Sequence, residues 1–232
     1  AEAVVAVSEG VADDLAGRTG LSRSSIEVIH NPVDLRKIQK AALEDPAHPW
    51  ASPGRPEFLV SIGRLVPQKD YPTLLRAFAK VRTRQRLRLL VLGEGPERHA
   101  LEVLAEELGI SDTVSFPGFV RNPYPFLGRA ASLVLPSRWE GFGVVLVEAL
   151  ACGCPVISTD CQSGPREILE DGRFGTLVPV GDAGALAEAI EMRHAASWDA
   201  ADLKRRAEDF RVEAVAQKYL TVMEGATSMT AG

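Results

Sequence analysis

The sequence has few cysteines, only three in 232 residues, and no apolar run of membrane-spanning length. An odd, closely spaced set, Cys152, Cys154 and Cys161, excludes a framework of disulfides. The Cys-x-Cys spacing could indicate a metal site, but no histidine lies near it in the sequence. We therefore interpret the three as buried, reduced thiols of a cytoplasmic protein.

The sequence also lacks an excess of basic residues, with 26 Lys and Arg against 31 Asp and Glu and a net charge of -5. This balance argues against nucleic acid as a partner, although a local basic site can still bind phosphate. Hydrophobic residues make up 46% and charged residues 25%, which excludes disordered and fibrous classes. The length is enough for one large domain, or for one domain with fragments of another.

Short apolar runs alternate with longer helical patterns along the chain. Continuous apolar runs are typical of strands that are covered on both faces, and alternation with helices predicts a parallel sheet. We therefore predict an α/β fold with a doubly wound parallel sheet, followed by extra helices over about 182–194, 199–209 and 212–225. The predicted strands are EFLVSIG (57–63), RLRLLVLG (86–93), TVSFPG (113–118), SLVLP (132–136), PVIST (155–159) and GTLVP (175–179).

In such a fold, ligands bind beyond the carboxyl ends of the strands, so the loops there are candidate sites. Gly63 permits a sharp turn after the first predicted strand, and Arg64 and Lys69 follow on the same loop. Two cations there could neutralise a diphosphate, or they could be ordinary solvated charges. Phe119 and Val120, after the third predicted strand, could provide a wall for a base, or a plain connection.

The densest apolar run, EGFGVVLVEALACG, contains two carboxylates. Gly141 and Gly143 permit close approach of the backbone to a ligand, and a helix starting near Val144 favours an anion at its N-terminus. Glu148 lies about one turn inside that helix, where a carboxylate needs partners. Two vicinal ribose hydroxyls would suit it, with Glu140 on the sugar side of the phosphates. The alternative is a structural bridge between Glu148 and an arginine.

Four segments together resemble a known family: EGFGVVLVE, GRLVPQKD, HNPVD and CGCPVISTDCQSGPREIL. The first matches the Glu-x7-Glu signature of retaining GT-B glycosyltransferases of the family 4 type, also called glycosyl transferases group 1. Pro32 stands where that family commonly has Gly. The order and spacing of all four segments agree with the C-terminal, donor-binding half of these enzymes, and the resemblance extends from about residue 3 to residue 225.

The resemblance implies a Rossmann-like unit that binds a UDP-sugar, or alternatively a GDP-sugar, without a metal or other cofactor. It implies that Arg64 and Lys69 hold the diphosphate, that Glu148 holds the ribose and that Glu140 holds the transferred sugar. Arg64, Lys69 and Glu140 would be catalytic, because they stabilise the departing diphosphate or hold the reacting sugar. The implied donor-binding set is Gly63, Arg64, Lys69, Val120, Glu140, Gly141, Phe142, Gly143, Val144 and Glu148.

The same resemblance divides the chain. Residues 1–30 resemble the last part of an N-terminal, acceptor-binding half, and 31–56 an interdomain linker. Residues 57–211 correspond to the nucleotide-sugar domain, 212–225 to a helix that crosses back toward the N-terminal half, and 226–232 to a loose tail. A glycan or a lipid-linked acceptor would bind to the N-terminal half. We expect this chain by itself to bind donor without transferring sugar.

Two other functions remain compatible with the sequence, a sugar-nucleotide epimerase of GT-B architecture and a non-catalytic nucleotide-sugar-binding module. A basic run over VRTRQRLRLL, which contains Arg82, Arg84, Arg86 and Arg88, also has two interpretations. It is either a solvated helix end that leads into a strand or a contact with acidic lipid in peripheral membrane association.

Overall fold

The fold centres on a six-stranded sheet, and the computed structural model describes residues 3–52, 57–82, 86–195 and 198–230. The strand order is β5-β4-β3-β6-β7-β8, and every neighbouring pair is parallel. The chain changes direction across the sheet between β3 and β6, and such a switch point places two loops side by side at the carboxyl edge. Each strand lies within a predicted run: β3 (Phe58–Ile62), β4 (Arg88–Leu92), β5 (Val114–Gly118), β6 (Ser132–Leu135), β7 (Val156–Thr159) and β8 (Thr176–Val178).

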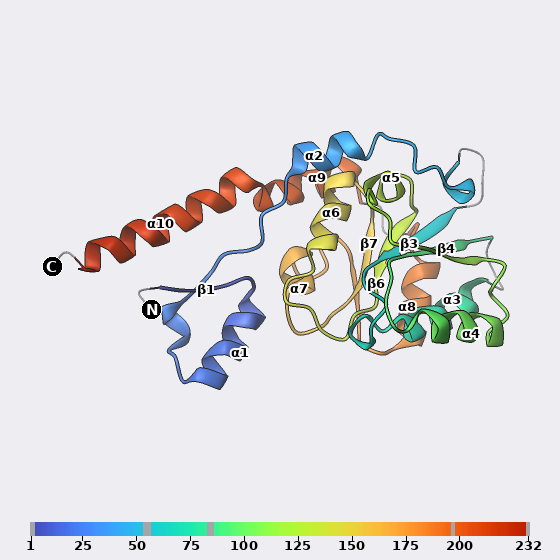
Figure 1. Cartoon of the computed structure of the whole chain (residues 1–232), viewed down its shortest axis with the longest axis horizontal. Coiled ribbons are helices and arrows are strands. Elements are labelled where there is room, and N and C mark those ends of the chain that lie inside the picture. The colour runs from blue at the N-terminus through green and yellow to red at the C-terminus, as the bar shows by residue number, and fades with distance from the viewer. Residues whose placement is uncertain (1–2, 53–56, 83–85, 196–197, 231–232) are drawn as a thin grey trace.

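Helices cover both faces of this sheet, as doubly wound folds require (Figure 1). One face carries α3 (Tyr71–Arg82), α4 (Arg98–Glu107) and α8 (Ala183–Glu191), and the other carries α2 (Leu35–Ala41), α5 (Tyr124–Leu127), α6 (Val144–Cys152) and α9 (Ala200–Ala207). Neighbouring strand residues point to opposite cores, so Val134 packs with the first set and Leu135 with the second. The predicted α/β fold with a doubly wound parallel sheet is confirmed.

A small unit precedes this domain in the sequence. It consists of β1 (Val4–Ala6), α1 (Glu9–Thr19), a 3-10 turn (Arg23–Ser25) and β2 (Ile26–Val28). The strand β2 does not lie in any predicted run. The two strands pair in parallel, and the buried cluster beneath α1 consists of Ala6, Ala12 and Ile26. Figure 1 shows this unit at one end of the molecule, away from the six-stranded sheet.

The segment predicted as a linker, 31–56, has more structure than its composition suggested. Asp34 caps α2 by accepting a hydrogen bond from the Lys37 amide. The helix buries Leu35 and Ile38 in the core that also contains α6. A second turn, of 3-10 type, covers Pro49–Ala51. Within its described residues the segment is therefore packed against the domain, because its few apolar side chains fall on one helical face.

The C-terminal region is helical, as predicted, but its end differs from the prediction. After α9, a 3-10 turn (Glu208–Phe210) leads into α10 (Val212–Thr230). The helix thus includes residues 226–230, which were expected to form a loose tail. A single internal glycine, Gly225, is unfavourable in a helix by about 1 kcal/mol but does not by itself end it. No helix among the described residues meets the length and apolarity that a membrane span needs.

Candidate functional site

Two loops meet at the carboxyl edge of the sheet, one after β3 and one after β6. The Lys69 ammonium lies 2.5 Å from one oxygen of Glu140, and the Ser137 hydroxyl donates to the same oxygen over 2.6 Å. The Lys69 and Glu140 side chains are only 16% and 8% exposed. Two residues predicted from separate motifs therefore form one ion pair, and Ser137 is a third member that the sequence did not reveal.

Gln68 holds these two loops together. Its carbonyl accepts a hydrogen bond from the Arg138 amide, and its side-chain amide donates to the Trp139 carbonyl, both over 2.8 Å. Asp70 adds an ion pair of 3.3 Å with Arg138. These contacts lie immediately beside Lys69 and Glu140 in the chain, so they fix the distance between the cation and the carboxylate before any ligand arrives.

A cavity of about 620 Å³ opens next to this pair. Its walls include Ile62, Gly63, Arg64, Leu92, Val120 and Pro123. The predicted residues Gly63, Arg64 and Val120 therefore line one space. The Arg64 side chain is exposed and has no hydrogen-bond or ion-pair partner within the part of the chain that the structure describes. Arg121 lines the same cavity, so its largely apolar wall carries two exposed guanidinium groups. Such a cavity suits a flat, polar-edged ligand that carries negative charge.

Gly63 connects the cavity to the ion pair. A Cβ atom at Gly63 would lie 3.2 Å from Cε of Lys69 and 3.1 Å from the Tyr71 hydroxyl. The Tyr71 hydroxyl donates to the Gly63 carbonyl over 3.1 Å, and burial raises the pKa of this phenol. The turn at Gly63, which belongs to the cavity wall, therefore packs directly on the stem of Lys69.

Glu148 has a different environment from Glu140. The alternative of a bridge to an arginine is wrong, because the partner of Glu148 is Tyr124, whose hydroxyl lies 3.1 Å from its Oε1. Burial raises the pKa of Glu148, although the bond from Tyr124 acts in the opposite direction. Burial and the neighbouring carboxylate raise the pKa of Tyr124 to about 12, so the phenol is the hydrogen-bond donor.

The Gly-Phe-Gly loop leads into α6, which starts at Val144 as predicted. A Cβ atom at Gly141 would meet nothing within 4 Å, so this side of the loop is open. The Phe142 side chain is buried, and its ring stacks on His30 with a centroid distance of 5.0 Å. The Phe142 side chain is therefore engaged in the interior, and Phe142 can meet a ligand through its backbone.

The opposite side of this loop is held by residues from elsewhere. Ser8, the residue that caps α1, donates its hydroxyl hydrogen to the Gly141 carbonyl over 2.7 Å. A Cβ atom at Gly164, where φ is +90°, would lie 1.7 Å from the Phe142 carbonyl oxygen. The N-terminal unit and the loop before α7 (Pro165–Ile168) thus fix the backbone of the Gly-Phe-Gly loop.

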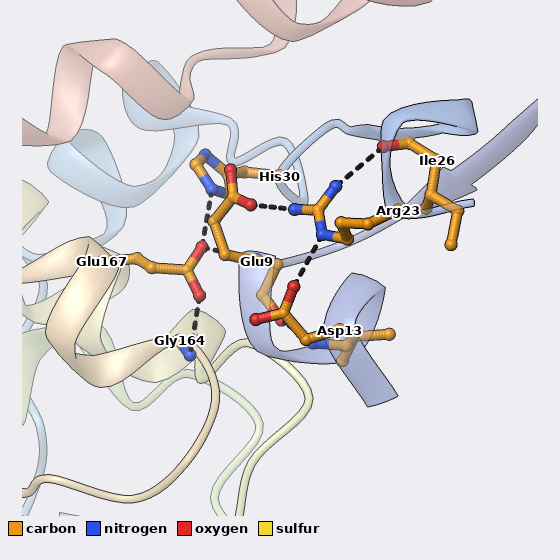
Figure 2. A network of polar contacts seen from close by, with 9 residues as sticks. Glu9, Asp13, Arg23, Ile26, His30, Gly164 and Glu167 are labelled. Carbon is orange, nitrogen blue, oxygen red and sulfur yellow. Dashed lines mark hydrogen bonds and ion pairs between the residues drawn. The ribbon is translucent and has the colours of Figure 1, made fainter. Parts of the chain in front are cut away.

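We call the polar contacts between the N-terminal unit and the domain the seam, and Glu167 lies at its centre (Figure 2). One oxygen accepts from the Glu9 amide over 2.9 Å and lies 3.2 Å from Nε2 of His30, while the other accepts from the Gly164 amide over 3.4 Å. Burial alone would raise the pKa of Glu167, but the bonds from His30 and the two amides outweigh it and lower that pKa. Arg23 extends the network through ion pairs with Glu9 and Asp13.

Several features outside this site were also predicted from the sequence. Cys154 and Cys161 are buried free thiols, and Cys152 is partly buried. Burial raises the pKa of Cys152 and Cys154 to about 12 and that of Cys161 to about 11. Among the described residues, no three His, Cys, Asp or Glu side chains form a metal-binding group.

Two arginines of the basic run have partners within the chain. Arg82 contacts the Gly109 carbonyl and Asp112, and the Arg88 guanidinium lies 4.7 Å from the ring centre of Trp50. Arg86 is exposed, and Arg84 lies outside the described residues. Two of the four arginines are thus engaged within the chain, which favours the interpretation of a helix end that leads into a strand.

Comparison with known proteins gives a family match. A model of the family described as glycosyl transferases group 1 matches residues 46–209. The chain is 35% identical over 191 residues to the N-acetylgalactosamine-N,N'-diacetylbacillosaminyl-diphospho-undecaprenol 4-alpha-N-acetylgalactosaminyltransferase of Campylobacter jejuni, covering 82% of this chain and 50% of that protein. It is 34% identical to the lipopolysaccharide core biosynthesis glycosyltransferase LpsE of Rhizobium meliloti, covering 80% and 53%.

A solved structure supports the fold. The Anabaena protein HepE, determined in complex with UDP and glucose, aligns with a TM-score of 0.82 at 24% identity, covering 97% of this chain and 64% of that one. The chain spans about half the length of the curated relatives it matches.

Proposed function

Because the chain belongs to the glycosyl transferases group 1 family, we propose that it is the donor-binding part of a glycosyltransferase of the retaining, family 4 type. The observation that carries this proposal is that Lys69, paired with Glu140, packs against Gly63 in the wall of the 620 Å³ cavity. In this arrangement the cation can bind a phosphate, the carboxylate can bind a sugar, and the apolar cavity beside them can hold a base.

The cavity and the residues around it suggest how a nucleotide sugar lies. The base enters the cavity against Val120, and the ribose hydroxyls donate to Glu148. Arg64 and Lys69 meet the diphosphate, with the backbone of the Gly-Phe-Gly loop opposite. Glu140, already held by Lys69, accepts from hydroxyls of the transferred sugar. UDP is the favoured nucleotide, and the bound UDP and glucose of HepE support a donor of that class.

Transfer with retention then needs no nucleophile from the protein. The bond between the anomeric carbon and the diphosphate oxygen breaks, and its electron pair stays on the diphosphate. The acceptor hydroxyl bonds to that carbon on the same face, and its proton passes to the departing phosphate. Arg64 and Lys69 stabilise the charge that develops on the diphosphate. The metal-free chemistry that the family resemblance implies is retained in the proposal.

The acceptor is proposed from the relatives alone. The names of the two curated relatives concern a diphospho-undecaprenol acceptor and a lipopolysaccharide core. We propose that this protein likewise extends a glycan or a lipid-linked glycan in polysaccharide biosynthesis, in the cytoplasm or at the inner face of the membrane.

Calorimetry tests donor binding directly. UDP and GDP are titrated into the 232-residue chain with and without a chelator, and we expect UDP to bind equally well in both. Arg64→Ala and Lys69→Ala should each weaken UDP binding by about 1.5–3 kcal/mol, because each removes a charged hydrogen bond. Neither should change uridine binding, and Arg205→Ala, an exposed arginine on α9, is the matched control. Absence of binding by both diphosphates would overturn the proposal.

A second experiment separates sugar from nucleotide. With an acceptor-binding half supplied in the same chain, Glu140→Ala should reduce turnover far more than UDP affinity, because Glu140 is assigned to the sugar. The anomeric configuration of the product is read by NMR. Inversion, or formation of an epimer without transfer, would exclude the proposed reaction.

A further inference from the structure

Glu148 is a partly buried carboxylate with no cation paired to it among the described residues. Among the described residues its hydrogen-bond partner is the hydroxyl of Tyr124, 3.1 Å from Oε1, and no ion pair involves it. A carboxylate has about four lone-pair sites on two oxygens, so one phenol leaves most of them unused. A group that can donate two hydrogen bonds is therefore required to satisfy this carboxylate once water is excluded.

Tyr124 is itself held in place by its neighbours. The Asn122 side chain accepts from the Tyr124 amide over 3.4 Å and donates to the Ala41 carbonyl over 3.3 Å and to Glu44 over 2.8 Å. These contacts attach the start of α5 to the end of α2. Pro123, between Asn122 and Tyr124, lines the cavity. The phenol therefore comes from a fixed segment next to the cavity wall.

We propose that Tyr124 is a positioning residue for ribose recognition, since its hydroxyl holds Oε1 of Glu148 so that the rest of the carboxylate accepts from the 2′- and 3′-hydroxyls of a nucleotide. The inference rests on the proposed function and adds to it the residue that orients Glu148 for ribonucleotides. Ribonucleotides should be selected over nucleotides without the diol by the pair Tyr124–Glu148, and not by Glu148 alone.

The physical reason is the cost of an incompletely bonded charge. Without the phenol, the carboxylate stays partly buried but loses the hydrogen bond that, among the described residues, orients it and favours its charged form. A rotated or protonated Glu148 can no longer accept from both hydroxyls. A nucleotide without those hydroxyls gains nothing from the oriented carboxylate, so its affinity does not depend on the phenol.

The experiment compares UDP with 2′,3′-dideoxy-UDP by calorimetry on the 232-residue chain. We expect the wild-type chain to prefer UDP by at least about tenfold, because two hydrogen bonds to a charged group are at stake. Tyr124→Phe should reduce that preference by about five- to tenfold and leave dideoxy-UDP affinity within about twofold, as expected for one lost hydrogen bond. Tyr219→Phe, a change of the same kind on the exposed face of α10, is the matched control.

A double-mutant cycle supplies the second variant. Glu148→Gln should abolish most of the preference, and adding Tyr124→Phe to it should change the preference no further. Equal loss of both ligands in Tyr124→Phe would indicate a merely structural role and overturn the inference, as would an unchanged preference. If the wild-type chain binds neither UDP nor dideoxy-UDP, the proposed function fails together with the inference. Binding of UDP with an unchanged preference defeats the inference alone.

Discussion

The six-stranded domain and the N-terminal unit of residues 3–30 are held in place by different forces. The domain has two large cores, one on each face of the sheet, and most of their members are fully buried. The N-terminal unit has a cluster of three buried residues, and its attachment to the domain includes the polar contacts of Ser8, Glu9 and His30. Apolar burial therefore fixes the first, while hydrogen bonds to Glu167 and Gly141 contribute to the attachment of the second.

This difference matters for the site, because the polar seam touches the Gly-Phe-Gly loop. Ser8 bonds to Gly141, and His30 stacks on Phe142. A unit with little apolar burial opens locally at a lower free energy than a domain with a large core. The loop is therefore supported on one side by the stable domain and on the other by a unit that can detach more readily.

The largest expected effect is on the free energy of unfolding, and it distinguishes the domain from the N-terminal unit. Leu90→Ala, in the middle of β4, should lower the free energy of unfolding by about 2–5 kcal/mol, because it leaves a cavity in a closely packed core. Ile26→Ala, in the N-terminal unit, should leave the main urea transition nearly unchanged and increase hydrogen exchange in β1 and β2 only. Val103→Ala, partly exposed on α4, is the control. Equal shifts for Leu90 and Ile26 would mean that the two regions unfold as one.

A smaller effect is expected at the seam. Glu167→Ala removes the acceptor of bonds from His30 and from the Glu9 and Gly164 amides, so the N-terminal unit should open more readily by about 1–3 kcal/mol. Hydrogen exchange at the α1 amides measures this opening. Asp14→Ala, which removes an exposed ion pair of the same unit, should change it by less than about 0.5 kcal/mol. Similar exchange in both variants would contradict the assigned role.

The same carboxylate predicts a pH dependence. The pKa of Glu167 is lower in the folded state than its usual value, so its contribution to attachment is complete above the unfolded pKa of about 4.3. That contribution is lost as the pH falls through the depressed folded value. Exchange of the α1 amides, corrected for its intrinsic pH dependence, should therefore rise in acid in the wild-type chain. In Glu167→Ala the increase in exchange at low pH should be smaller. An increase as large as in the wild-type chain would mean that another group causes the pH dependence.

The smallest expected effect concerns the loops after β3 and β6. Gln68→Ala removes the bond from the side-chain amide to the Trp139 carbonyl and leaves the main-chain bond to Arg138. We expect UDP binding to weaken by about 0.5–1.5 kcal/mol, since one neutral hydrogen bond that positions Lys69 and Glu140 is lost. Gln217→Ala on α10 is the control for calorimetry. A loss as large as that of Lys69→Ala would mean that Gln68 meets the ligand itself.

The strands of the domain could be predicted because each is a continuous apolar run with a turn residue beside it. The strand β2 has three residues, and only Ile26 of them is buried, so no run of sufficient length marks it. The site residues came from motifs at strand ends, which parallel topology brings together. Tyr124 and Glu167 could not be found in this way, because their roles depend on contacts across 24 and up to 158 positions of sequence. The Lys69–Glu140 pair was likewise invisible, although both members were identified.

Two glycines show where the chain folds closest upon itself. A Cβ atom at Gly93 would lie 1.9 Å from the Gly63 carbonyl oxygen, and one at Gly164 would lie 1.7 Å from that of Phe142. A Cβ atom at Gly141, by contrast, would meet nothing within 4 Å. In a library randomised at all three codons and selected for expression, positions 93 and 164 should return almost only glycine, while position 141 should accept many side chains. If a later selection for activity restricts the side chains accepted at position 141, the bound substrate and not the fold causes that restriction. The residues recovered at this codon during directed evolution would then indicate how much space the substrate leaves there.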